Sequence, residues 1–267
     1  MRKYLSYFKM RYIGALQYRA AALAGIVTQI AWGFMLLLSY FAFYKSGANN
    51  FPMDFEELSS YIWLSQAFFS MFVLWSFDED IFSSIASGDI AYELSRPLDL
   101  YWLWYVKNMA MRTAKASLRA VPMLIIAAFL PAPFGLSLPA SPLRFLLFLA
   151  SFLLAFMLLT SVLMIIYISA FFTVSPQGTK IIVTTVGDFF AGVIIPIPFF
   201  PEWLQPLFYA LPFAYMQSSP FLIYVGHTSL IESLYFLVGQ VFWLAVLLLI
   251  GKLMLSKALK RVVVQGG

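Results

Sequence analysis

Long runs of uncharged, mostly apolar residues alternate with short charged segments along the chain. A helix that crosses a bilayer needs about 20 apolar residues, because the hydrocarbon core is about 30 Å thick and each helical residue adds about 1.5 Å. Four runs meet this requirement: 20–43, 58–77, 145–174 and 233–251. We expect each of them to form a membrane-spanning helix.

Two weaker runs complete the predicted fold. The run 120–130 is long enough only if its helix begins earlier, with Lys115 and Arg119 in the first turns, and the run 181–195 contains Asp188. Counting both, residues 1–267 form a single all-α integral membrane domain with six transmembrane helices. The predicted spans are about 20–44, 57–77, 112–131, 144–172, 180–198 and 231–255.

The stretch 203–231 is also uncharged and could be a seventh span. It contains Pro206, Pro212 and Pro220, and an odd number of spans would place the basic tail on the outer side. We therefore predict that 196–226 is a re-entrant hairpin that enters the outer leaflet before the last span. Non-helical backbone at that depth must be covered by protein or water, so we expect this hairpin to pack closely against other helices.

The basic residues predict the orientation of the chain. With the N-terminus inside, all but two of the 17 Lys and Arg residues fall in the inner segments, and only Lys45 and Arg144 fall outside. Because Lys and Arg are retained on the cytoplasmic side, we expect both termini in the cytoplasm. The net charge of +5 then indicates contact with anionic lipid and no binding of nucleic acid.

Composition excludes most enzyme chemistry. The chain is 62% hydrophobic and 11% charged, whereas soluble proteins are about 45–50% apolar and about 25% charged. It has no cysteine and one histidine, His227, which argues against disulfides, thiol catalysis and a metal site. The pair Gly251-Lys252 lacks the flanking residues of a phosphate-binding loop. We therefore expect no enzyme activity in this chain.

The first 19 residues predict an interfacial helix. Leu5, Phe8, Tyr12 and Leu16 share one helical face, while basic residues tend to the other side. The helix could act only as a topological anchor, or as a strut that couples a cytoplasmic partner to the first span.

The most informative segment is 78–105, after the second span. Asp78, Glu79 and Asp80 favour a helix start, and Gly88 is suited to its end. Arg96-Pro97 then interrupts the helix, and Asp99 would cap the next one. The apolar face of the short helix is formed by Ile81, Phe82 and Ile85, to which Ala86 could belong, and Ser84 lies on the same helix. We expect a partner to dock on this face, the alternative being a solvated connector.

These residues resemble a known family. The matching positions are Ser87, Gly88, Asp89, Ile90, Ala91, Leu94, Arg96, Pro97, Leu98 and Asp99, with Gln17-Tyr18-Arg19 at the start of the first span. Together with the layout, they are similar to the ABC type-2 exporter permeases, in particular the six-span bacterial branch.

The resemblance implies that 78–88 is a coupling helix seated on a nucleotide-binding ATPase subunit, which would bind ATP and Mg²⁺ while this chain binds no cofactor. It also implies a dimer of permeases, homomeric or heteromeric, in the bacterial cytoplasmic membrane.

Asp188 is the only acid inside a predicted span. Such a carboxylate pairs, faces the protein interior or lines a water path. We expect an ion pair with Lys115, Arg119 or Lys180, and the alternatives are a role in gating or substrate passage or simple hydration of the carboxylate.

Small residues at four-residue spacing let helix backbones approach closely in lipid. Ala20–Ala24, Ala21–Gly25 and Gly187–Ala191 have this spacing. They predict a permease–permease interface on the first and fifth spans, with ordinary packing inside one chain as the alternative.

The sequence thus favours the permease of an ATP-driven exporter. An ion-gradient-driven carrier using Asp188 is the alternative, although no inverted repeat is visible. A membrane scaffold without transport activity is a third possibility.

Overall fold

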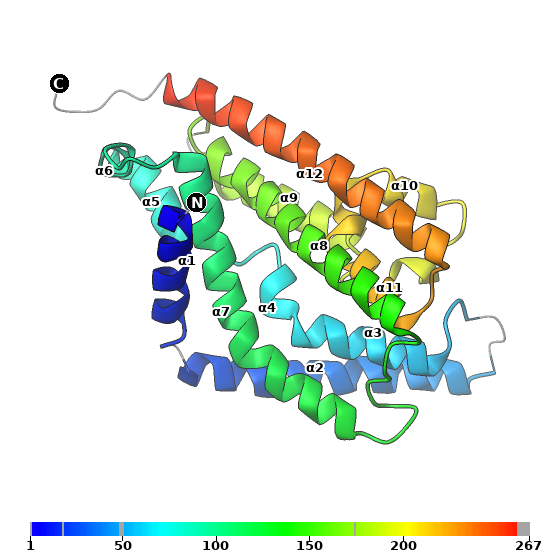
Figure 1. Cartoon of the computed structure of the whole chain (residues 1–267). Coiled ribbons are helices and arrows are strands. Elements are labelled where there is room, and N and C mark those ends of the chain that lie inside the picture. The colour runs from blue at the N-terminus through cyan, green and yellow to red at the C-terminus, as the bar shows by residue number, and fades with distance from the viewer. Residues whose placement is uncertain (1, 18, 48–50, 174, 261–267) are drawn as a thin grey trace.

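The computed structural model describes residues 2–17, 19–47, 51–173 and 175–260, and in these ranges all regular structure is helical (Figure 1). The predicted all-α fold is confirmed for this part of the chain. Tyr18 and Arg261, which entered the predicted family motif and the basic tail, lie outside the described residues.

Three helices in the described ranges are long and apolar enough to cross a membrane. They are α2 (Arg19–Lys45), α8 (Pro142–Ser169) and α12 (Leu230–Leu259), at the positions of the first, fourth and last predicted spans. The helices α8 and α12 pack along each other, and the buried Gln240 of α12 donates hydrogen bonds to the carbonyl and hydroxyl oxygens of Ser151 at 3.1 and 2.9 Å.

The helix α7 (Leu100–Phe129) begins earlier than the predicted third span, which starts at about 112. The carboxylate of Asp99 accepts a hydrogen bond from the amide of Trp102 at 3.0 Å and caps the helix. The helix contains no proline before Pro122, and it continues past that residue to Phe129. It packs against α2 and against α3 (Phe55–Ala67).

The second predicted span, 57–77, is wrong as a single helix. The helix α3 ends at Ala67, α4 covers only Phe69–Phe72, and the backbone is extended at Val73. Thirteen helical residues reach about 20 Å, less than the hydrocarbon thickness. The physical reason is the buried Arg112, whose guanidinium binds the backbone carbonyls of this segment, as described below.

The fifth predicted span, 180–198, is also shorter than expected. The helix α9 (Gln177–Phe190) ends eight residues early, and Gly192 turns the chain with a φ of +70°. Four short helices follow: η1 (Ile197–Phe199), α10 (Gln205–Tyr209), η2 (Pro212–Tyr215) and α11 (Ser218–Val225). Seven of the eight residues of α11 are buried, and α11 packs against α8 and α3. The expected close packing is therefore present, and the depth of this hairpin in the bilayer stays a prediction.

The helix α1 (Arg2–Ala15) runs along the first half of α7. Tyr4 Oη accepts a hydrogen bond from the Asp99 amide at 3.1 Å, and the Tyr12 hydroxyl donates to Ser117 Oγ at 3.1 Å. Tyr7, which is not on the predicted apolar face, is buried, whereas Leu5 on that face is 70% exposed; the position of the helix in the membrane interface stays a prediction. In Figure 1, α1, α5, α6 and the end of α12 lie at one end of the molecule.

Candidate functional site

The predicted coupling helix is α5 (Glu79–Ser87), followed by α6 (Ile90–Leu94). Asp78 caps α5, since its carboxylate accepts a hydrogen bond from the Asp80 amide at 3.2 Å. Gly88 ends the helix with a φ of +81°, a conformation that a residue with a Cβ rarely adopts. The helix therefore has the predicted boundaries.

The predicted docking face of α5 is wrong, because it packs into the chain itself. Ile81 is 1% exposed and Phe82 is 6% exposed, and Ile85 packs against the same core. The ring of Phe82 lies 5.0 Å from the ring of Tyr167 in α8. An amphipathic pattern shows that one face of a helix must be covered, and here the core of the same chain covers it.

The exposed residues of α5 and α6 are mostly polar or small, and the exceptions are Tyr92 and Leu94. Ser84 is half-buried, and its hydroxyl donates to the Ile81 carbonyl at 2.9 Å. Tyr92 is 73% exposed although it is aromatic. We call this surface the α5–α6 outer face; its exposed residues are Glu79, Asp80, Ser83, Ala86, Ser87, Gly88, Asp89, Tyr92 and Leu94.

Two lysines form ion pairs with acidic residues at the start of α5. Lys107 of α7 is buried and forms an ion pair with the buried Asp78, with 2.8 Å between Nζ and Oδ2. Lys180 of α9 binds Glu79 at 2.9 Å and lies 3.8 Å above the Phe82 ring. Neither pair was predicted from the sequence, because the partners are 29 and 101 positions apart.

The segment before α5 is held by Arg112 of α7. This buried guanidinium donates to the carbonyls of Met71, Val73 and Ser76 at 3.0, 2.7 and 2.6 Å. Lys115, one turn later, donates to Ser76 Oγ at 3.3 Å. These bonds satisfy carbonyls that a continuous second helix would have used internally.

A third connection reaches α8. The Asp78 amide donates to the Tyr167 hydroxyl oxygen at 2.8 Å, and that hydroxyl donates to Asn108 Oδ1 at 3.0 Å. The start of α5 is therefore bonded to α7, α8 and α9 at once.

The family-motif residues connect α6 to α7. Arg96 and Pro97 are exposed after α6 and before the Asp99 cap of α7. Asp89 accepts a hydrogen bond from the Ser87 hydroxyl at 2.7 Å. This part of the motif forms a turn between two helices and contributes exposed residues beside the α5–α6 outer face.

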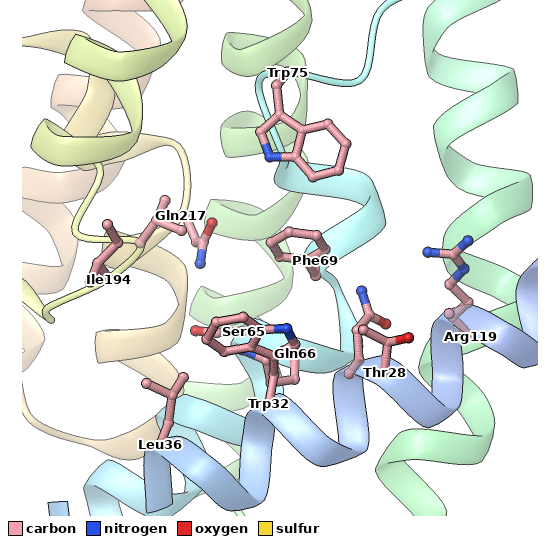
Figure 2. Close-up of a pocket in the computed structure, with 13 residues that line it drawn as sticks. Thr28, Trp32, Leu36, Ser65, Gln66, Phe69, Trp75, Arg119, Ile194 and Gln217 are labelled. Carbon is pink, nitrogen blue, oxygen red and sulfur yellow. The ribbon is translucent and has the colours of Figure 1, made fainter. Parts of the chain in front are cut away.

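A cavity of about 480 Å³ lies between α2, α3, α4 and α7 and reaches the segments that flank α9 and α11 (Figure 2). Its wall is mostly apolar and aromatic, with Trp32, Phe69 and Trp75, and it also contains Gln29, Ser65 and Arg119. Arg119 lines a second cavity of about 430 Å³ together with Lys115. The sequence did not predict either cavity.

Asp188 does not form the expected ion pair among the described residues. Lys115 binds Ser76, Arg119 donates to the Ala21 carbonyl at 3.3 Å, and Lys180 binds Glu79. Asp188 Oδ1 is buried and has no hydrogen-bond partner in the described part of the protein.

The small residues have different surroundings in α2 and α9. Gly187 packs inside the chain, where an added Cβ would collide with Leu74 of the α4–α5 connection, and Ala191 is 2% exposed. The predicted interface role of Gly187–Ala191 is therefore replaced by intramolecular packing. Gly25 accommodates the Arg119 guanidinium, whereas Ala20 and Ala24 are exposed on α2.

A family model described as "ABC-2 family transporter protein" matches residues 23–266. The chain belongs to the ABC-2 transporter family. No curated protein matches the sequence. The match confirms the resemblance carried by the 87–99 motif and identifies the chain as a membrane subunit of an ABC transporter.

Proposed function

We propose that this chain is the permease subunit of an ATP-binding cassette exporter in a bacterial cytoplasmic membrane. A separate nucleotide-binding subunit binds ATP and Mg²⁺ and hydrolyses the ATP, and this chain contributes the path across the membrane. The observation that carries the proposal is α5, a capped helix at one end of the molecule whose inner face is fixed to the bundle and whose outer face is exposed.

The α5–α6 outer face is the docking site of the nucleotide-binding subunit in this proposal. Closure of the ATPase on ATP moves α5, and the Lys107, Arg112 and Tyr167 contacts carry this movement to α7 and α8. Export is then a shift between inward-open and outward-open packings of the helices, because ATP binds the closed state more tightly.

A second permease, identical or related, completes the path. The exposed side of α2 carries Leu23 and Val27 at 65% and 69% exposure, and α9 carries Ile182 at 64%. Ala20 and Ala24 are exposed on α2, and such small side chains permit the close approach of another helix. These apolar surfaces are suited to lipid or to a second permease.

The orientation follows from charge. We place α1, α5, α6 and the end of α12 on the cytoplasmic side, because this end carries most of the basic residues. Both termini are then cytoplasmic.

Affinity purification of the tagged chain in mild detergent tests the proposal. A nucleotide-binding subunit should co-purify, and Ala86→Arg on the outer face of α5 should release it because the substitution places a long cation inside the contact. Ala140→Arg is the matched control, since Ala140 is exposed outside the α5–α6 region. Full retention of the subunit by Ala86→Arg would contradict docking at this face.

One observation favours the alternative of an ion-gradient-driven carrier, namely the unpartnered Oδ1 of Asp188. In that case a proton ionophore would abolish transport and ATP depletion at a constant gradient would not. The exporter proposal predicts the reverse, and membership of the ABC-2 family supports it.

A further inference from the structure

The second cavity, of about 430 Å³, lies where the end of α1 meets the start of α2, against the middle of α7 (Figure 1). Its wall consists of alanine and apolar side chains from the three helices and of two cations, Lys115 and Arg119 of α7. The described residues that line it include no acid. We call it the α1–α2 cavity; its volume is sufficient for a small polar group.

Lys115 lies at the centre of the face that α7 turns toward this cavity. Met111 and Leu118, which also line it, are four residues before and three residues after Lys115, so the three share one helical face. Arg119 borders α2, where a Cβ added to Gly25 would lie 2.5 Å from Arg119 Cζ. Residues four apart on a helix have Cβ atoms about 5–6 Å from each other. The long side chains of Lys115 and Arg119 can therefore reach one anionic group in the cavity.

The positive charge on this face of α7 is not neutralised by the chain. Arg112, Lys115 and Arg119 follow one another at helical spacing, and none of them forms an ion pair with a described residue. Lys115 donates to Ser76 Oγ and Arg119 donates to the Ala21 carbonyl, both at 3.3 Å, and both acceptors are neutral. Like charges at this spacing repel each other. An anion that enters the cavity would relieve this repulsion.

The surroundings of the cavity favour a lipid as the source of that anion. The cavity borders the first turn of α2, a membrane-spanning helix, and the positive end of a helix dipole attracts anions. Next to the lining residues, Ile13 of α1 and Leu23 of α2 are 50% and 65% exposed. A phospholipid satisfies both features, since its phosphate meets the cations and its acyl chains cover the apolar surface. Basic pockets between membrane helices commonly bind lipid head groups.

We propose that the α1–α2 cavity binds an anionic phospholipid whose phosphate lies between Lys115 and Arg119 and whose acyl chains lie on the apolar surface at Leu23. Phosphatidylcholine is a poorer ligand, because its choline group would bring a further positive charge to two cations. Only the assignment of the lipid to the cytoplasmic leaflet rests on the orientation given under the proposed function.

Binding of dioctanoylphosphatidylglycerol tests the site. The full-length chain, purified in a neutral maltoside detergent, is titrated with the lipid, and the rise in the thermal unfolding midpoint gives an apparent affinity because a ligand of the native state stabilises it. Lys115→Gln and Arg119→Gln should each bind the lipid about fivefold more weakly, which is the contribution of one Lys or Arg near an anionic membrane surface. Lys45→Gln is the matched control, because Lys45 is an exposed cation at the other end of α2.

Two substitutions that keep both cations separate lipid binding from a structural role. Ser76→Ala removes the protein acceptor of Lys115, so this variant should bind the lipid at least as tightly as the wild type. Ala15→Leu fills the cavity from α1 without changing any charge, so it should weaken binding several-fold. Native mass spectrometry counts the bound lipids in parallel and reports binding directly where a variant is less stable.

Equal affinity for phosphatidylglycerol in Lys115→Gln, Arg119→Gln and the wild type would overturn the proposal. Equal stabilisation by dioctanoylphosphatidylcholine would also overturn it. Glycerol phosphate is the probe for a soluble anion, and if it stabilises the chain at the concentration at which the lipid does, a lipid is not the specific occupant. Because binding is measured without a nucleotide-binding subunit, the lipid site and the proposed function can fail independently.

Discussion

Replacing Lys107 by methionine removes the cation that pairs with Asp78 at the start of α5. The two side chains are 3% and 4% exposed, so the variant leaves a buried, uncompensated carboxylate. Loss of one partner from a buried ion pair costs about 3–5 kcal/mol. Asp80, at 3.6 Å from Lys107 Nζ, adds little to the wild-type pairing because its side chain is 84% exposed.

The double variant Lys107→Met with Asp78→Asn provides the internal control. It contains neither buried charge, and asparagine retains the ability to cap α5. Because a buried pair is often no more stable than neutral groups of similar volume, we expect the double variant to recover to within about 1–2 kcal/mol of the wild type. The free energy of unfolding is measured by titrating dodecyl sulfate into mixed micelles and following tryptophan fluorescence.

The reasoning is refuted by either of two results. A Lys107→Met variant as stable as the wild type would show that the pair does not hold α5. A double variant less stable than Lys107→Met alone would show that the carboxylate is not the source of the loss.

Three further predictions concern side chains around α5 and α9. Ile81→Asp should lower the yield of monodisperse permease in size-exclusion chromatography even without a partner, because Ile81 is 1% exposed; a normal elution profile would show that the apolar face of α5 is free. Glu79→Gln should cost less than about 1 kcal/mol in the same dodecyl sulfate titration, because Glu79 in its pair with Lys180 is 67% exposed; a larger loss would mean that this pair, too, holds α5. Asp188→Asn should not lower the free energy of unfolding, because Asp188 forms no ion pair in the described part of the chain; marked destabilisation would reveal a partner for the carboxylate.

Local sequence patterns predicted the helices whose position and ends depend on residues close to one another in the chain. The apolar runs located α2, α8 and α12, and the cap residues Asp78, Gly88 and Asp99 located the ends of α5 and the start of α7. These features depend on hydrogen bonds between near neighbours and on the length of apolar stretches, both of which can be read directly from a sequence.

Long-range contacts could not be predicted in this way. The second span is interrupted because Arg112 binds the carbonyls of Met71 and Val73, about 40 positions earlier in the chain. The apolar face of α5 is covered by Tyr167, which is 85 positions from Phe82. A single sequence shows that Ile81 and Phe82 need a partner surface, but the same pattern arises whether that surface belongs to the permease or to another subunit.

The most direct test of the docking site uses the absence of cysteine from the chain. A single cysteine is introduced at Ser83, which is exposed on the outer face of α5, or at Leu138, which is 90% exposed outside the α5–α6 region. The purified complex is then treated with a short thiol-to-amine cross-linker. The proposal predicts a covalent product between the Ser83→Cys permease and the nucleotide-binding subunit and no such product with Leu138→Cys. Cross-linking from Leu138→Cys alone would contradict docking at the α5–α6 outer face.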